Sequence, residues 1–240
     1  MQSTLIRLPG IVANGLRPLI MGPPPPEPWL PSQLASLRGW WEAQTLGLAE
    51  GAAISSLPSS GGLSNTLAQA TVGNQPTYGF INGKGAIHLD GNDDSLAMSD
   101  KSVSNAASAL TFFCLFKLDA ISSDATTKYF ISLSTNSSTT PVRAALALNN
   151  AASSSTYYTV VYRPTDAGIQ VSVVSTALAD TNTHLVIATV NYGSPKVDIW
   201  LDGTNVLNNT PAFTPGTTDA SNSAGAVVGN RASLYKAWTA

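Results

Sequence analysis

The chain has 240 residues, of which 11% are charged, and a formal net charge of −2 at pH 7. This near-neutral balance, with no five-residue window rich in Lys or Arg, excludes the basic surface that nucleic-acid binding requires. No window approaches the roughly 18 apolar residues that a membrane span needs, so membrane insertion is not expected either. Low charge with many small polar residues is typical of proteins covered by other chains, and equally of extracellular or virion proteins.

Residues 1–30 differ in composition from the rest of the chain and are predicted to form an N-terminal arm. Arg7 and Pro9 interrupt any apolar run near the start, so no export signal is expected. The unbroken prolines from Pro23 to Pro26 favour a semi-rigid polyproline II spacer. The apolar patches before it are too short to form a core. We therefore predict that the arm binds a partner through Leu5, Ile6, Ile11, Leu19, Ile20, Met21, Pro23 and Pro26. The alternative is a disordered tail, or a strand folded back on its own domain.

From residue 31 the sequence predicts one all-β domain, residues 31–240. Strands are expected at 37–42, 86–89, 95–98, 110–118, 129–133, 143–148, 156–162, 169–174 and 225–230, and residues 52–75 read as a long loop. Many short strands with turn signals between them and no long helix indicate a two-sheet antiparallel sandwich or jelly roll.

Two stretches carry most of this prediction. In residues 110–118 one face holds Leu110, Phe112, Cys114, Phe116 and Leu118, while the other holds Phe113 and Leu115. A strand that is apolar on both faces is expected to be central and covered on both sides. Residues 185–206 predict a meander, because Val197, Ile199 and Leu201 share one face and Asp202-Gly203 fits a tight hairpin turn.

Several of these segments, taken in order, resemble a known module. Leu37–Ala43, the stretch GKGAIHLDGNDDSLA at 83–97, the hairpin at 183–203 and Val228-Gly229-Asn230-Arg231 together resemble the concanavalin A-like, laminin G-type jelly roll, over about residues 33–231. Such modules commonly continue with another strand after this point. Ser233–Trp238, the N-terminal arm or a neighbouring subunit are the alternatives for supplying that closing edge.

The resemblance also carries a functional expectation, because this pattern is frequent in tailed-bacteriophage structural proteins. It implies a non-enzymatic virion protein, either a capsid decoration, a head fibre or a tail-associated component. Its expected location is the virion, its expected partners are other capsid or tail proteins, and a homo-oligomer is expected.

Catalysis is not predicted. Glucanases of this fold use paired carboxylates along one strand, whereas Asp198 and Asp202 stand four residues apart and Asp202 belongs to a turn. A glycoside hydrolase is therefore disfavoured. His88 and His184 are interpreted as hydrogen-bonded strand histidines, and Cys114 as a small core residue.

Two binding sites are nevertheless considered. Tyr158 and Tyr162 share a strand face and Trp200 lies on the polar face of its strand, so outward aromatics would stack on sugars of a cell-surface glycan. A carbohydrate-binding adsorption module is thus the second hypothesis, and packing under loops is the alternative. Asp90, Asn92 and Asp94 offer oxygen ligands suited to calcium. The favoured alternative there is a turn held by Asx hydrogen bonds, with no cofactor.

Overall fold

The computed structural model describes residues 31–62, 65–98, 103, 105–121, 127–134, 142–149, 156–165, 168–218 and 226–229. The chain divides into two units, Met1–Leu30 and Pro31–Ala240, and every described residue belongs to the second. The predicted arm, including all of its partner-binding residues, therefore lies outside the described residues.

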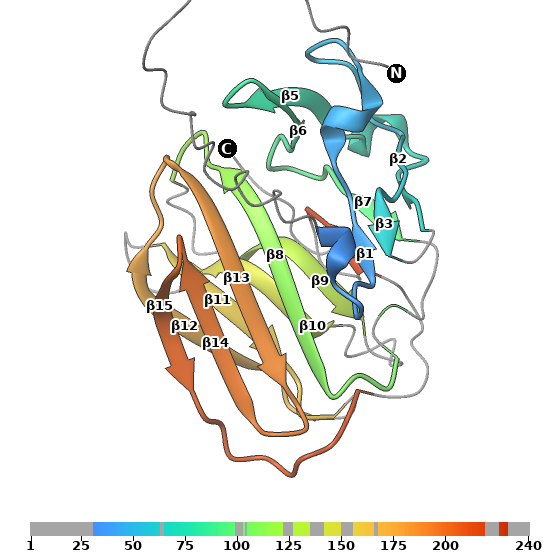
Figure 1. The fold of residues 1–240 in the computed structure, drawn as a ribbon. Helices are drawn as coiled ribbons and strands as arrows, with labels where there is room; N and C mark the ends of the chain where they lie inside the picture. Colours follow the sequence, from blue (N-terminus) through green and yellow to red (C-terminus); the bar gives the residue numbers. More distant parts are fainter. Residues whose placement is uncertain are drawn as a thin grey trace, which may run out of the picture. The chain divides into compact units, whose positions relative to one another are not determined.

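The described chain is all-β, and every strand pair is antiparallel (Figure 1). The larger sheet has the order β12-β11-β10-β9-β16-β7-β4-β2 and the smaller sheet the order β15-β14-β13-β8. Two further sheets have two strands each, β1-β3 and the hairpin β5-β6. The part of the chain that the structure describes contains three short 3-10 turns and no α-helix. No described helix is long and apolar enough to cross a membrane.

The bounds of the elements follow. The larger sheet comprises β2 (Ser56–Leu57), β4 (Leu67–Ala68), β7 (Leu96–Met98), β9 (Thr127–Ser134), β10 (Val142–Asn149), β11 (Tyr157–Tyr162), β12 (Val171–Leu178) and β16 (Ala226–Val228). The smaller sheet comprises β8 (Ala109–Lys117), β13 (Thr183–Asn191), β14 (Lys196–Leu201) and β15 (Thr204–Asn209). The two-stranded sheets are β1 (Gly39–Trp40) with β3 (Gly61–Gly62), and the hairpin β5 (Thr77–Ile81) with β6 (Lys84–His88). The 3-10 turns are η1 (Pro31–Gln33), η2 (Ala43–Leu46) and η3 (Val72–Asn74).

The two sheets share one apolar core, which gives the domain a sandwich-like construction. Period-2 alternation places Val186 and Ala188 of β13 and Ile199 of β14 on the inner face of the smaller sheet, where they are buried. They belong to the same buried cluster as Leu146 of β10 and Val160 of β11, on the inner face of the larger sheet. The all-β prediction is confirmed.

The meander predicted at residues 185–206 is also confirmed. β13, β14 and β15 pair in sequence order, with Ile187 opposite Trp200 and Ile199 opposite Leu207. Asp202 and Gly203 both have positive φ angles, 49° and 84°, as a two-residue hairpin turn of the primed type requires. Asp202 is one of three described non-glycine residues with positive φ, and its side chain bonds back to the strand, as shown below.

The prediction that residues 110–118 form a central strand covered on both sides is wrong. Among the described strands, β8 lies at the edge of the smaller sheet and pairs with β13 alone (Figure 1). Its inner face is buried through Phe112 and Phe116, whereas Phe113 and Leu115 on its outer face are exposed. The strands that are buried on both faces are β10 and β11, in the larger sheet. Apolar residues on both faces of a strand therefore occur in this chain both where one face is exposed, as in β8, and where both faces are buried, as in β10.

Residues 52–75, predicted as a loop, contain two-residue strands that extend the larger sheet. β2 and β4 pair with each other, and β4 pairs with β7. Ile54, Leu57 and Leu67 are fully buried in the core. The Ser- and Gly-rich composition concealed these short elements, because a two-residue strand has no detectable period.

Candidate functional site

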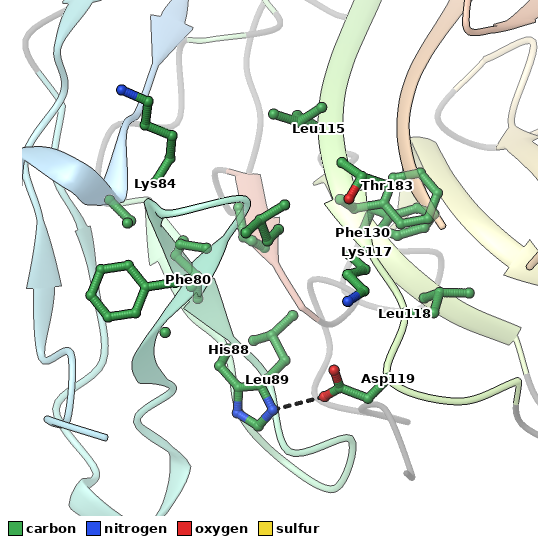
Figure 2. Close-up of a pocket in the computed structure, with 18 of the residues that line it drawn as sticks. Phe80, Lys84, His88, Leu89, Leu115, Lys117, Leu118, Asp119, Phe130 and Thr183 are labelled. Atoms are coloured by element: carbon green, nitrogen blue, oxygen red, sulfur yellow. Dashed lines mark hydrogen bonds and ion pairs between the residues drawn. The ribbon is translucent and has the colours of Figure 1, made fainter. Parts of the chain in front are cut away.

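A cleft of about 1370 Å³ lies beside β8, between the smaller sheet and the β5-β6 hairpin. One wall carries Leu115 and Lys117 from β8, and the other carries Phe80, Lys84 and His88 from the hairpin (Figure 2). Phe113 of β8 also lines the cleft. Its lining also includes Pro31 and Val228, the first and nearly the last of the described residues. The edge strand of the smaller sheet therefore borders a hollow rather than another layer of the domain.

The wall formed by β8 is unusually apolar for a surface. Leu115 is 64% exposed and Phe113 54% exposed, and Leu185, opposite Leu115 on β13, is 40% exposed. Single exposed apolar residues are ordinary, whereas adjacent ones on one sheet face form a patch of the kind found at interaction sites. These three residues are called the outer apolar patch below.

A histidine–carboxylate pair spans the cleft at one end. His88 Nε2 lies 2.9 Å from Asp119 Oδ2, which joins the end of β6 to the segment just after β8 (Figure 2). The other ring nitrogen, Nδ1, lies 3.3 Å from the Thr77 hydroxyl on β5. Both partners in the ion pair are largely exposed, so the pair aligns the two walls more than it stabilises the fold. The interpretation of His88 as a hydrogen-bonded strand histidine is confirmed.

His184 is held more tightly, between two carboxylates. Its Nδ1 lies 2.6 Å from Asp202 Oδ2 and its Nε2 lies 2.8 Å from Asp180 Oδ1. The second Asp202 oxygen accepts the Leu185 backbone N–H at 2.9 Å, so the carboxylate of the hairpin turn also fixes the start of β13. Satisfying both ionised carboxylates requires a proton on each ring nitrogen. The bonded arrangement is thus that of an imidazolium.

The pKa values in this cluster follow from that geometry. Burial lowers the pKa of His184, but the hydrogen bonds to Asp202 and Asp180 outweigh burial and raise it above its ordinary value. The bond from His184, followed by that from the Leu185 N–H, lowers the pKa of Asp202. The backbone N–H of Asn182, followed by His184, lowers the pKa of Asp180. With both nitrogens engaged, His184 has no lone pair with which to activate a nucleophile.

The structure corrects the sugar-stacking prediction for the two tyrosines. Tyr158 and Tyr162 are buried in the core between the sheets, where Tyr158 packs edge-on against Phe116 and Tyr162 against Phe213. Burial raises the pKa of Tyr158 to about 12, and neighbouring carboxylates add to the effect. The expectation that these rings face outward is wrong, because β11 turns this face toward the smaller sheet. Trp200 remains partly exposed on the outer face of β14.

The acidic loop predicted to be able to bind calcium is arranged mainly by its own hydrogen bonds. Asp90 Oδ1 accepts the Asn92 backbone N–H at 2.8 Å, which is an Asx turn, and Asp94 Oδ2 accepts the Asp90 N–H at 2.9 Å. The carboxylates of Asp90, Asp93 and Asp94 come within 4.8 Å of one another. Burial raises the pKa of the Asp94 carboxyl, in spite of its bond from the Asp90 backbone. The favoured Asx turn is present, and calcium binding stays a prediction.

The carboxylates considered for glycoside hydrolysis are poorly placed for it. Asp198 belongs to β14, whereas Asp202 belongs to the turn after it, where His184 and the Leu185 N–H hold its carboxylate. Asp198 is buried and lies 3.2 Å from Lys196 Nζ. Asp180 and Asp202 lie on either side of His184, whose ring fills the space where a sugar would bind.

Comparison with known proteins adds no identification. No protein-family model matches the chain, and no curated protein is similar to it. The site must therefore be assessed from its geometry. Sequence reasoning missed the cleft, because its two walls come from segments about thirty residues apart whose pairing no local pattern encodes. The one available signal was the pair of apolar side chains on the second face of residues 110–118.

Proposed function

We propose that this protein is a non-enzymatic structural component of a tailed-bacteriophage virion, attached to capsid or tail proteins through its N-terminal arm and present as a homo-oligomer. The observation that supports an association role is the outer apolar patch beside an unpaired sheet edge. Exposed apolar area of this kind is favourable only when another surface covers it. The jelly-roll topology and the virion location come from the resemblance of the sequence motifs, and they belong to the same proposal.

The described residues also support a role without catalysis. His184 has both ring nitrogens bonded to carboxylates, His88 is engaged by Asp119 and Thr77, and Cys114 carries a thiol whose pKa burial raises to about 12. Neither His184 nor Cys114 has the free, activated form that a nucleophile or general base needs. A binding or scaffolding role requires none of them.

Deletion of residues 1–30 tests the arm. The buried core lies within the described part of the second unit, between Ala43 and Val227, so the deleted protein is expected to remain folded. It is expected to lose incorporation into particles, measured by co-sedimentation with virions assembled in its presence. Incorporation equal to that of the full chain would refute the role of the arm. Loss of folding, measured by circular dichroism, would instead refute the independence of the domain.

The second candidate function is a carbohydrate-binding adsorption module, which Trp200 now favours in place of the tyrosines. Its partly exposed ring pairs across the ladder with Ile187, which lies opposite Phe113, so aromatic and apolar side chains follow one another across the outer face of the smaller sheet. A glycan array with and without calcium tests this function. Binding that is lost in Trp200→Ala would support it, and no binding under either condition would eliminate it.

A further inference from the structure

The outer edge of β8 is nine residues long and has no paired strand among the described residues. Along Ala109–Lys117 the strand pairs with β13 in an unbroken register, from Ala109 opposite Asn191 to Lys117 opposite Thr183. Within the described chain no strand pairs with its other side, and no backbone hydrogen bond from Ala109–Lys117 goes elsewhere. Long, flat, apolar edges of this kind are the sites at which sheets accept an additional strand.

The sequence of β8 is that of an internal strand rather than of an edge. Natural edge strands are protected by charges, prolines or bulges, yet here the single charged residue is Lys117 at the end, and the pairing contains no bulge. Phe113 and Leu115 face outward at its centre. We propose that β8 is the acceptor for one further strand, and that this strand is Ser233–Trp238 of the same chain.

The path of the chain favours this segment. β16 ends at Val228, which lines the cleft bordered by β8. Gly229 then has a φ of 85°, and a Cβ at this position would come within 2.8 Å of the Asp94 carbonyl oxygen and of Leu89. The glycine therefore directs the chain out of the larger sheet at the cleft wall. Ser233 is four residues beyond Gly229, a distance in sequence that can span at most about 13 Å.

The composition of the segment matches the position as well. In Ser233–Trp238 alternation places Leu234 and Trp238 on one face, with Lys236 between them, and Tyr235 and Ala237 on the other, with Ser233 before them. A strand beside β8 needs apolar side chains on both faces, since its neighbour presents Phe113 and Leu115 outward and Phe112 and Phe116 inward. Same-face neighbours on paired strands contact each other, so the added strand would cover part of the outer apolar patch.

A segment of the same chain fits better than the edge of a second copy. The β5-β6 hairpin forms the opposite wall of the cleft, so β8 faces a bounded hollow and not open solvent (Figure 2). A single strand needs about 4.8 Å beside its neighbour, whereas a second sandwich would need the hairpin to move away. A tether of four residues also gives the segment a high effective concentration at the edge. This inference holds whether or not the protein belongs to a virion.

Hydrogen exchange on the full-length chain tests the proposal. The double variant Tyr235→Pro with Lys236→Pro removes two successive N–H groups, so one group that would face β8 is lost in either orientation. In the wild-type chain the peptide covering 109–117 is expected to be protected along both edges. In the variant up to three of its amides, those that would bond to alternate residues of the six-residue segment, are expected to exchange at least ten-fold faster. The peptide covering 183–191 is an internal reference, because β13 has neighbours on both sides.

Two further variants keep the result interpretable. Asn14→Pro with Gly15→Pro places the same pair of substitutions in the N-terminal arm and is expected to leave exchange in β8 unchanged. Leu234→Asp with Trp238→Asp keeps every backbone N–H and removes the apolar contacts, and it is expected to release β8 while β13 stays protected. If the double-proline variant also loses protection in β13, the double-aspartate variant is used in its place.

Three outcomes would overturn the proposal. Equally fast exchange of the 109–117 peptide in all proteins would show an open edge. Equally slow exchange in all of them would show that another segment covers it. Protection that rises with protein concentration, together with a dimer mass, would assign the edge to a second copy.

Discussion

Replacing His184 with glutamine is expected to remove most of the pH dependence of stability between pH 5.5 and 8.5. The His184 side chain is 11% exposed and lies between Asp202 and Asp180. A hydrogen bond to a charged group contributes about 1.5–3 kcal/mol. Because the Asp202 side chain is 50% exposed, solvent screening places its bond at the lower end, at about 1.5 kcal/mol. The bond to Asp180, whose side chain is 51% exposed, is left out of this figure.

The sign follows from the directions of the pKa shifts. The pKa of His184 is raised in the folded state, so its contribution is complete below the unfolded pKa and is lost as the pH rises through the folded pKa. The pKa of Asp202 is lowered, so its contribution is present above the unfolded carboxyl value and is lost as the pH falls through the folded value. The cluster is therefore most stabilising between these two ranges, in mildly acidic solution.

Urea unfolding at pH 5.5 and 8.5 measures the effect. The wild-type protein is expected to lose about 1–1.5 kcal/mol of unfolding free energy on going to pH 8.5, and His184→Gln is expected to change little. Tyr158 and Phe116 lie near the imidazole, and neither titrates in this range, because the Tyr158 pKa is about 12. His88→Gln is the matched control, since its pair with Asp119 is exposed. An unchanged pH dependence in His184→Gln, or its loss in His88→Gln, would refute the reasoning.

Three further predictions concern the core and the turn. Phe112→Ala is expected to cost about 3–5 kcal/mol in urea unfolding, whereas Phe113→Ala on the exposed face of β8 should cost under about 1 kcal/mol; similar costs would contradict the assigned faces. Tyr158→Phe removes a buried hydroxyl without a hydrogen-bond partner among the described residues, so thermal unfolding should show no loss or a gain of up to about 1 kcal/mol; a clear loss would reveal a partner. Gly203→Ala should lower the unfolding free energy by about 1 kcal/mol, because φ is 84° at this position and the space around it is open. Gly216→Ala is the control, since this position is equally unobstructed and has no positive φ, and it should leave the unfolding free energy unchanged. Equal effects of the two substitutions would exclude backbone strain as the cause.

The sequence predicted where the strands lie along the chain better than it predicted which strands pair with each other. Alternation located β8, β10, β11 and β14 to within a few residues, because a buried face repeats every second position. It assigned β8 to the centre of a sheet, since apolarity on both faces says that a strand is covered without saying by what. Its actual position at an edge depends on non-local pairing, for which β8 itself carries no signal. Two-residue strands such as β2 were missed because they are too short to show a period.

The candidate site was less predictable than the fold. Tyr158 and Tyr162 were expected on an outward face, but alternation along β11 does not specify which of its two faces meets the other sheet. The partners of His184 come from the segment before β13 and the turn after β14, which only the folded meander brings together. The acidic loop was predicted more accurately, because the Asx bond from Asp90 to Asn92 is local in sequence.

The partly buried Cys114 thiol can report on opening of the core. The sulfur shares the inner face of β8 with Phe112 and Phe116, and burial raises the thiol pKa to about 12, so almost none of it is ionised in neutral solution. A free thiol in an open chain has a pKa of about 8.5 and reacts readily with disulfide reagents. Although Cys114 is only partly buried, little thiolate is therefore available in the native molecule for oxidation or cross-linking. A thiol-reactive dye is expected to modify Cys114 slowly. The rate of this modification would measure how often β8 and β13 separate from the core.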